Sequence, residues 1–143
     1  EKDKRLDIEN RNVQLKTVYI YTFKRQGDED YHVIFGTTND ISTAKFFNCE
    51  ISGLSPSGTY GRDKLIDARN SFESYFGIVD KCATSYYRND FREQPVPVLL
   101  EGSLFYDGEH CDHYENNGPQ KWKELEVSIA WELHPITKIE FLE

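Results

Sequence analysis

Apolar and polar side chains alternate along much of the chain, and this pattern predicts strands. Runs of alternating residues bounded by turn residues are typical of strands with one buried face. The predicted strands cover residues 18–24, 31–36, 45–52, 98–106 and 127–134, and the last continues after Pro135 through 136–142. The turn clusters at 26–30 and 36–40 separate the first three strands, and we expect the first two to form a hairpin.

One segment has helical spacing instead. Arg69, Phe72 and Phe76 recur three to four positions apart within residues 62–76, and Gly77 is placed to end the helix. The order is therefore strand, strand, strand, helix, strand, strand.

This order predicts a mainly β fold, a five-stranded Greek-key barrel of the OB type with one helix. We expect the helix to pack across the third and fourth strands. A ubiquitin-like or general α+β sheet is the competing fold. A chain of 143 residues suits one domain, at 17–143, and we expect the charged residues 1–16 to form a flexible lead-in.

Charge narrows the classes of partner. The net charge of −8 opposes binding to nucleic acid, because phosphate backbones require lysine and arginine, whereas acidic surfaces suit cations or basic partners. No apolar run approaches the roughly 20 residues that cross a bilayer. The chain has no methionine, so we expect it to be a processed product.

Five short motifs stand out along the chain: DYHVI at 30–34, CEI at 49–51, Ala68 with Arg69, GSLFYD at 102–107 with His110, and WELHPI at 131–136. Together they resemble a bacterial family of small, mostly exported proteins with an OB-like fold and no established activity. The resemblance implies the barrel fold and a location in the periplasm or at the cell surface, and it implies no substrate.

The familiar catalytic motifs are absent from the sequence, but a set of residues that could bind a metal is present. The chain contains no phosphate-binding loop, nucleophile elbow, HExxH or CxxC motif. Carboxylates and imidazoles are ligands that Zn²⁺ prefers, and Glu132 and His134 share one face of a strand. If the barrel brings Asp107 and His110 beside that face, these residues form a candidate site for a divalent metal.

The same residues have structural interpretations. His110 and His134 follow or end strands, where an imidazole can bond backbone carbonyls. Arg69 is expected to pair with a buried carboxylate, with Glu50 and Glu132 as the candidates.

The chain has three cysteines. Cys49 is expected to be a small buried residue within a strand. Cys82 and Cys111 could form a disulfide, although spacing alone does not establish a pairing. The count is odd, so at least one thiol is unpaired.

The face of the second and third strands is the candidate ligand surface. OB-type barrels often bind oligonucleotides or oligosaccharides on this face, where aromatic rings stack and amides bond hydroxyls. The candidate residues are Tyr31, His32, Phe46, Asn48 and Tyr60. The alternative is that most of these rings belong to the core.

Three functions follow. The first is an exported, non-enzymatic binding or accessory domain without a cofactor, which contacts a carbohydrate, peptide or protein through the barrel face and residues 107–126. The second is a metal-dependent hydrolase that uses the carboxylate and histidine set. The third is a purely structural or interaction role.

Overall fold

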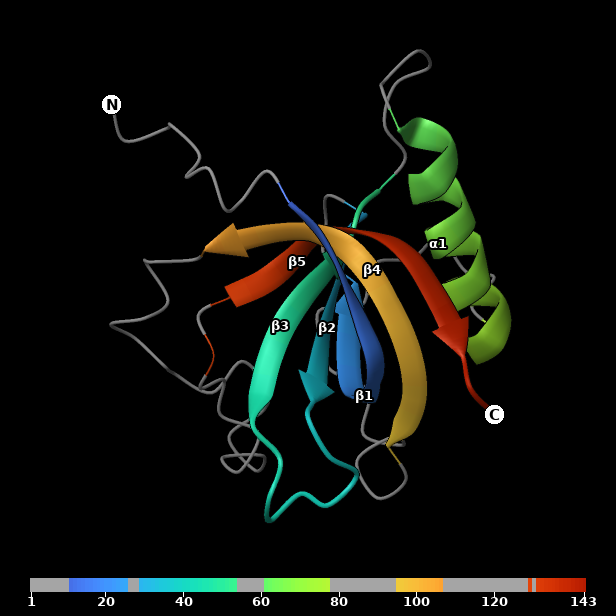
Figure 1. Cartoon of the computed structure of the whole chain (residues 1–143). Coiled ribbons are helices and arrows are strands. Elements are labelled where there is room, and N and C mark those ends of the chain that lie inside the picture. Colours follow the sequence, from blue (N-terminus) through green and yellow to red (C-terminus); the bar gives the residue numbers. More distant parts are fainter. Residues whose placement is uncertain (1–10, 26–28, 54–60, 78–94, 107–128, 130) are drawn as a thin grey trace.

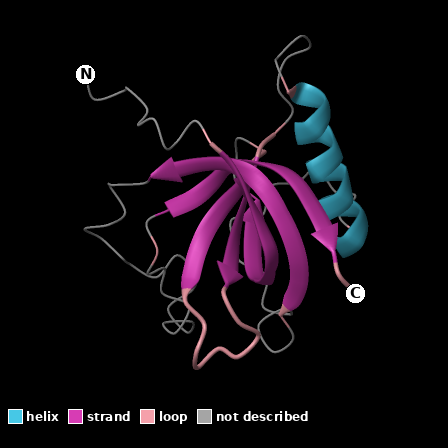
Figure 2. Ribbon diagram, in the orientation of Figure 1, coloured by secondary structure: helices cyan, strands magenta, loops and turns pink. Residues whose placement is uncertain are grey.

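The computed structural model describes residues 11–25, 29–53, 61–77, 95–106, 129 and 131–143. Its elements are β1 (Asn12–Arg25), β2 (Tyr31–Gly36), β3 (Phe46–Ile51), α1 (Arg62–Phe76), β4 (Val96–Tyr106) and β5 (Trp131–Phe141). The fold is mainly β, a small barrel of OB type with one helix, as the element order predicts (Figures 1 and 2). No helix among these residues is long and apolar enough to cross a membrane.

The five strands form one sheet in the order β3-β2-β1-β4-β5, and every hydrogen-bonded pair is antiparallel. The long strand β1 pairs with β4 through its first half and with β2 through its second half. Its register shifts between Leu15 and Val18 and again between Ile20 and Thr22. Such bulges increase the local twist, so they bend β1 enough for the sheet to curl.

The two outer strands of the curled sheet meet and bring the barrel toward closure. The amide of Ile129, just before β5, donates to the Phe46 carbonyl at 3.2 Å, and the Leu133 amide donates to Cys49 Sγ at 3.2 Å. Because residue numbers rise together in these two pairs, β5 runs parallel to β3 along this seam.

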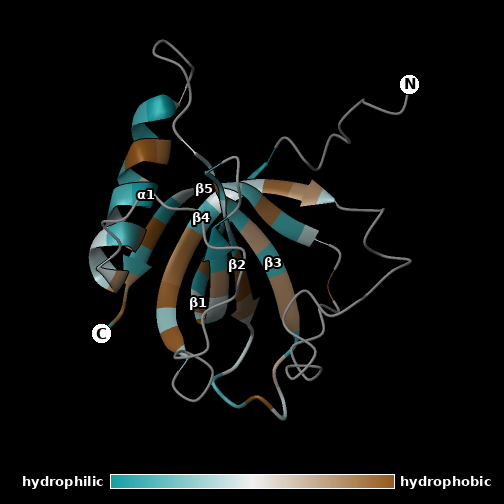
Figure 3. Cartoon of the chain, turned by 180° about the vertical axis from the view of Figure 1, so that it is seen from behind, coloured by the Kyte–Doolittle hydropathy of each residue, from teal (hydrophilic) through white to brown (hydrophobic). Residues whose placement is uncertain are grey.

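Alternation places one set of side chains inside the barrel and another outside it. Phe47, Cys49 and Ile51 belong to the main core, whereas Phe46 joins a small second cluster on the outer face. Figure 3 shows the corresponding brown and teal bands along the strands. The division of β3 into these two faces is confirmed.

Helix α1 covers one end of the barrel. It packs mainly against β5 and also touches β3 (Figure 1). The Phe72 ring lies between Phe23 and Tyr31, with ring centroids 4.8 and 5.0 Å away. The bounds of the predicted helix are confirmed, and the Gly77 amide closes its last turn on the Glu73 carbonyl. The expected packing across the third and fourth strands is wrong, because β5 supplies the main contact.

The N-terminal boundary differs from the prediction. Residues 12–16 belong to β1 and pair with β4, from Asn12 opposite Ser103 to Leu15 opposite Leu100. Polar residues alternate here with half-buried Val13 and Leu15, which pack against the core. The many polar and charged residues make this strand difficult to predict from the sequence. Residues 1–10 lie outside the described part of the chain.

Strand β5 is continuous where the sequence predicts an interruption. Pro135 lies within it, after a cis peptide bond, and the register with β4 shifts around Gly102. The bulge predicted at Gly102 is therefore confirmed, and it accommodates a proline that cannot donate to the sheet.

Candidate functional site

Four ionisable side chains meet on the outer face of the barrel at the seam between β3 and β5. We call them the seam cluster: His32, Glu50, Glu132 and His134. The two oxygens of Glu50 each contact a different imidazole, at 3.2 Å from His32 Nε2 and 2.9 Å from His134 Nε2. The opposite nitrogen of His134, Nδ1, lies 3.5 Å from a Glu132 oxygen.

The fold explains why these residues meet. His32 and Glu50 are directly opposite each other in the β2–β3 pair, so their side chains share the outer face. Glu132 and His134 are two apart in β5 and also share a face. The parallel seam then places β5 beside β3, which brings His134 to Glu50.

The Glu50 carboxylate is the centre of the cluster. Burial raises the pKa of Glu50, but hydrogen bonds with the two imidazoles and with Asp30 outweigh burial and hold this pKa well below its ordinary value of 4.5. The side chain is only 14% exposed. Glu50 is therefore a stably charged, largely buried anion that requires cationic or hydrogen-bonding neighbours.

His134 supplies the matching charge. The contacts with Glu132 and Glu50 raise the pKa of His134 to about 10 against the opposing effect of burial. The Glu50 contact is the stronger of the two, because it is 2.9 Å long, whereas the 3.5 Å Glu132 contact is too long for a good hydrogen bond. Indeed, His134 Nδ1 has no well-formed hydrogen bond within the described residues. At neutral pH the imidazole is a cation between two carboxylates.

This charge state bears on the metal hypothesis. A metal ligand must be a neutral imidazole, so Zn²⁺ would have to displace a proton that His134 holds up to a pKa of about 10. No group of three or more histidine, cysteine or acidic side chains within the described residues has the arrangement of a metal site. Asp107 and His110, the other two proposed ligands, lie outside the described part of the chain.

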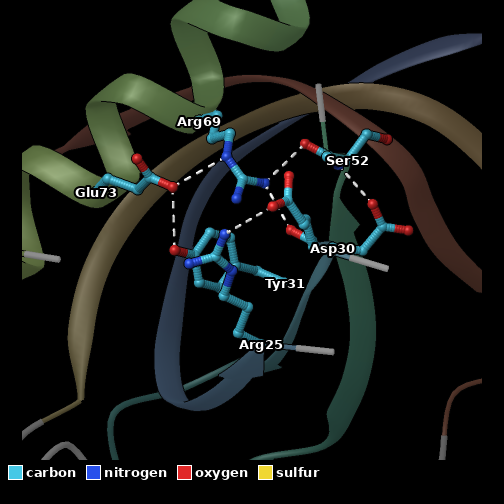
Figure 4. A network of polar contacts seen from close by, with 8 residues as sticks. Arg25, Asp30, Tyr31, Ser52, Arg69 and Glu73 are labelled. Atoms are coloured by element: carbon cyan, nitrogen blue, oxygen red, sulfur yellow. Dashed lines mark hydrogen bonds and ion pairs between the residues drawn. The ribbon is translucent and has the colours of Figure 1, made fainter. Parts of the chain in front are cut away.

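A second polar network joins helix α1 to the covered end of the barrel (Figure 4). Arg69 donates through Nη1 to the carbonyls of Glu29 at 2.8 Å and Ser52 at 3.1 Å, and its Nε contacts Glu73 at 2.9 Å. The hydroxyl of Tyr31 donates to the same Glu73 oxygen at 3.0 Å. Arg69 thus pairs with a carboxylate in its own helix, and the expected pairing with Glu50 or Glu132 is wrong.

The opposite end of the barrel contains an apolar pocket of about 230 Å³. We call it the open end. It is formed by the first half of β1, the starts of β3 and β5 and the end of β4, whereas the Arg69 network lies at the other ends of β1 and β3. The pocket is lined by Val13, Leu15, Val18, Thr37, Phe47, Leu104, Ile129, Trp131, Glu132 and Leu133.

Aromatic surface continues outward from this pocket. Tyr106 ends β4, lies opposite Trp131 in the register and is 40% exposed. The two ring centroids are 5.0 Å apart. A large, exposed apolar ring next to an apolar pocket is an arrangement found at binding surfaces.

A larger hollow of about 390 Å³ lies between α1 and strands β4 and β5. It is lined by side chains of both charges, including Lys64, Asp67, Glu101 and Lys138. Because its lining carries both positive and negative charges, this hollow does not indicate a class of ligand. The apolar pocket at the open end is the more informative of the two.

Two of the five candidate ligand residues are buried. Tyr31 and Phe46 are 1% and 3% exposed, so neither ring is available to a ligand. His32 belongs to the seam cluster, and Asn48 is partly buried on the same outer face, its side-chain oxygen without a hydrogen-bond partner in the described residues. Tyr60 lies outside the described residues.

The cysteines differ in what the structure describes. Cys49 is buried and unpaired, and burial raises the pKa of its thiol, so it is an unreactive core residue. Cys82 and Cys111 fall outside the described residues.

Two features of the site were missed from the sequence. Glu50 was considered only as a partner for Arg69, although the β2–β3 hairpin register already places it opposite His32. Trp131 and Tyr106 alternate correctly for the inner face, but only their pairing across β4 and β5 indicates that they extend the pocket.

Comparisons of the chain with protein-family models, curated proteins and solved structures give no match. The two ends of the barrel differ: α1 covers one, and the other contains the apolar pocket.

Proposed function

We propose that the chain is a non-catalytic binding domain that contacts a peptide or protein partner through the open end of its barrel. The apolar pocket of about 230 Å³ is the observation that carries this proposal. Small apolar pockets that accept a group from a partner are the usual centres of binding energy in protein interfaces. Export to the periplasm or the cell surface remains part of the proposal, supported by the family resemblance alone.

The lining favours a peptide or protein over a carbohydrate. Sugars require several hydrogen-bonding groups, whereas this pocket is formed mostly by aliphatic and aromatic side chains. The hydroxyl of Thr37, which lines the pocket, already accepts a hydrogen bond from the Lys45 amide at 3.0 Å. A carbohydrate would leave most of its hydroxyls without partners in such a site, which is costly.

The seam cluster supports a binding role more than a hydrolytic one. Its carboxylates and imidazoles bond one another and stabilise the meeting of β3 and β5. His134 is poorly suited to act as a general base near neutral pH, because it holds its proton up to a pKa of about 10.

A thermal-shift screen tests the proposed function. The protein is heated with a panel of basic peptides, acidic peptides, neutral glycans and single-stranded DNA. A ligand at 100 times its Kd stabilises the folded state by about 2.7 kcal/mol, which raises Tm by several degrees. We expect peptides to raise Tm and DNA to leave it unchanged. A panel in which no peptide raises Tm would remove the proposal.

A further inference from the structure

We propose that the pocket at the open end accepts one uncharged aromatic side chain from a basic segment of the partner. This inference deepens the proposed function and rests on it. It names the group that enters the pocket and the charge of the chain that carries it.

The volume of the pocket suits a single side chain of the partner. The pocket measures about 230 Å³. A cavity of roughly 150 Å³ holds benzene, and pockets for drug-sized ligands range from about 300 to 1,000 Å³. The open end is therefore large enough for one aromatic ring with its linking carbon and too small for a larger organic ligand.

The lining selects an uncharged group. Among the described residues that line the pocket, Glu132 alone is ionisable, and its carboxylate lies 3.5 Å from His134. A charged group would lose its water in the pocket without gaining a partner, which is unfavourable. The Trp131 ring and the branched side chain of Leu133 instead offer the contacts that an aromatic ring requires.

The surface beside the pocket favours a peptide segment over a free small molecule as the ligand. The exposed ring of Tyr106 next to Trp131 extends the apolar surface beyond the pocket. A residue beside the inserted ring could pack there, as occurs when a peptide presents consecutive side chains. The net charge of −8 attracts lysine and arginine and repels acidic segments, so the partner segment is basic.

The test compares four short synthetic peptides on the unmodified protein by isothermal titration calorimetry. Three have a central phenylalanine, alanine or tryptophan between two pairs of lysines, and the fourth has phenylalanine between two pairs of glutamates. We expect the phenylalanine and tryptophan peptides with lysines to bind at least about tenfold more tightly than the alanine peptide, because anchor residues in pockets dominate affinity. The glutamate peptide should bind most weakly.

Two variants locate the binding site. Val13→Phe places a ring inside the pocket and should weaken the phenylalanine peptide by at least about tenfold. Gln14→Phe is the control, because it adds the same ring at the neighbouring residue, whose native side chain bonds Glu101 and does not line the pocket. The Kd of the phenylalanine peptide for this variant should stay within about twofold of that for the unmodified protein. The peptide series on the unmodified protein keeps the test decisive if Val13→Phe fails to fold.

The outcomes separate this inference from the proposed function. Equal binding of the alanine and phenylalanine peptides would overturn the pocket assignment and leave a peptide-binding domain. Equal binding of the lysine and glutamate peptides would overturn the basic partner alone. No peptide binding here, together with a thermal-shift screen in which no peptide raises Tm, would remove both.

Discussion

At the scale of single residues, β4 and β5 pack so closely around Gly102 that the barrel requires a residue without a side chain there. Gly102 lies at the bulge in β4, opposite the stretch of β5 that contains Pro135. A Cβ at this position would lie 2.6 Å from the Pro135 carbonyl oxygen and 3.1 Å from Leu133 Cβ. The backbone of β5 would have to move to accept it.

Gly102→Ala should therefore destabilise the protein by about 1–3 kcal/mol, the usual result of forcing extra atoms into a packed interior. Urea unfolding monitored by circular dichroism measures the change. Ser103→Ala is the matched control on the same strand, and it should alter stability by no more than about 0.5 kcal/mol. Equal stability of Gly102→Ala and the unmodified protein would show that the two strands are not packed this closely.

His134 links the stability of the fold to pH. Its pKa rises from 6.5 to about 10 on folding, through its contacts with Glu132 and Glu50. Its stabilisation is thus fully present below pH 6.5 and is lost as the pH rises toward 10. The lowered pKa of Glu50 acts in the opposite direction, so its stabilisation is present above pH 4.5 and declines as the pH falls.

His134→Gln should be less stable than the unmodified protein, with the largest difference between about pH 4.5 and 6.5 and a shrinking difference toward pH 10. Free energies of unfolding from urea titrations at several pH values give this profile, and ionisations elsewhere cancel in the difference. A difference that stays constant from pH 6.5 to 10 would contradict the charged pairing of His134 with Glu50.

At the scale of elements, the sequence predicts most of what the structure contains. The helix bounds, strand β2 and the two faces of β3 follow from periodicity, because each depends on local alternation. The start of β1 and the continuity of β5 do not, since a half-exposed strand rich in charge resembles a loop and a proline resembles an interruption. Both strands are stabilised by pairing with β4, which is remote in sequence.

Arg69 adds polar contacts to the packing of helix α1 on the barrel. The guanidinium connects three separate segments through Glu29, Ser52 and Glu73, and its side chain is almost fully buried. Removing one partner of a buried charged pair leaves the other charge and the carbonyls without donors.

Arg69→Met keeps a long apolar side chain but removes the donors, and it should cost about 3 kcal/mol. Lys64→Met, on an exposed position of the same helix, is the control and should cost no more than about 0.5 kcal/mol. The Glu73→Gln substitution should cost less in the Arg69→Met background than in the unmodified protein, because the pair is already broken. Additive costs in this double-mutant cycle would show that the two side chains do not interact.

At the scale of the whole molecule, the two ends of the barrel have different roles. One end is covered by α1, with Phe72 and the Arg69 network beneath it, and the other contains the apolar pocket that Trp131 helps to line. The sequence identifies the inward residues of each strand but not which of them lie beneath α1 and which line the pocket. That difference appears only when the curled sheet brings β1, β4 and β5 to the same end.

Intermolecular nuclear Overhauser effects test the central claim, that the open end is the binding surface, most directly. The protein carries ¹³C-labelled methyl groups, and the partner is the unlabelled peptide with phenylalanine between pairs of lysines. The account predicts contacts from the phenylalanine ring to the methyl groups of Val13, Leu104 and Leu133, which line the pocket. Contacts to Ala68 or Ile51, at the covered end, with none to the pocket methyl groups, would contradict it.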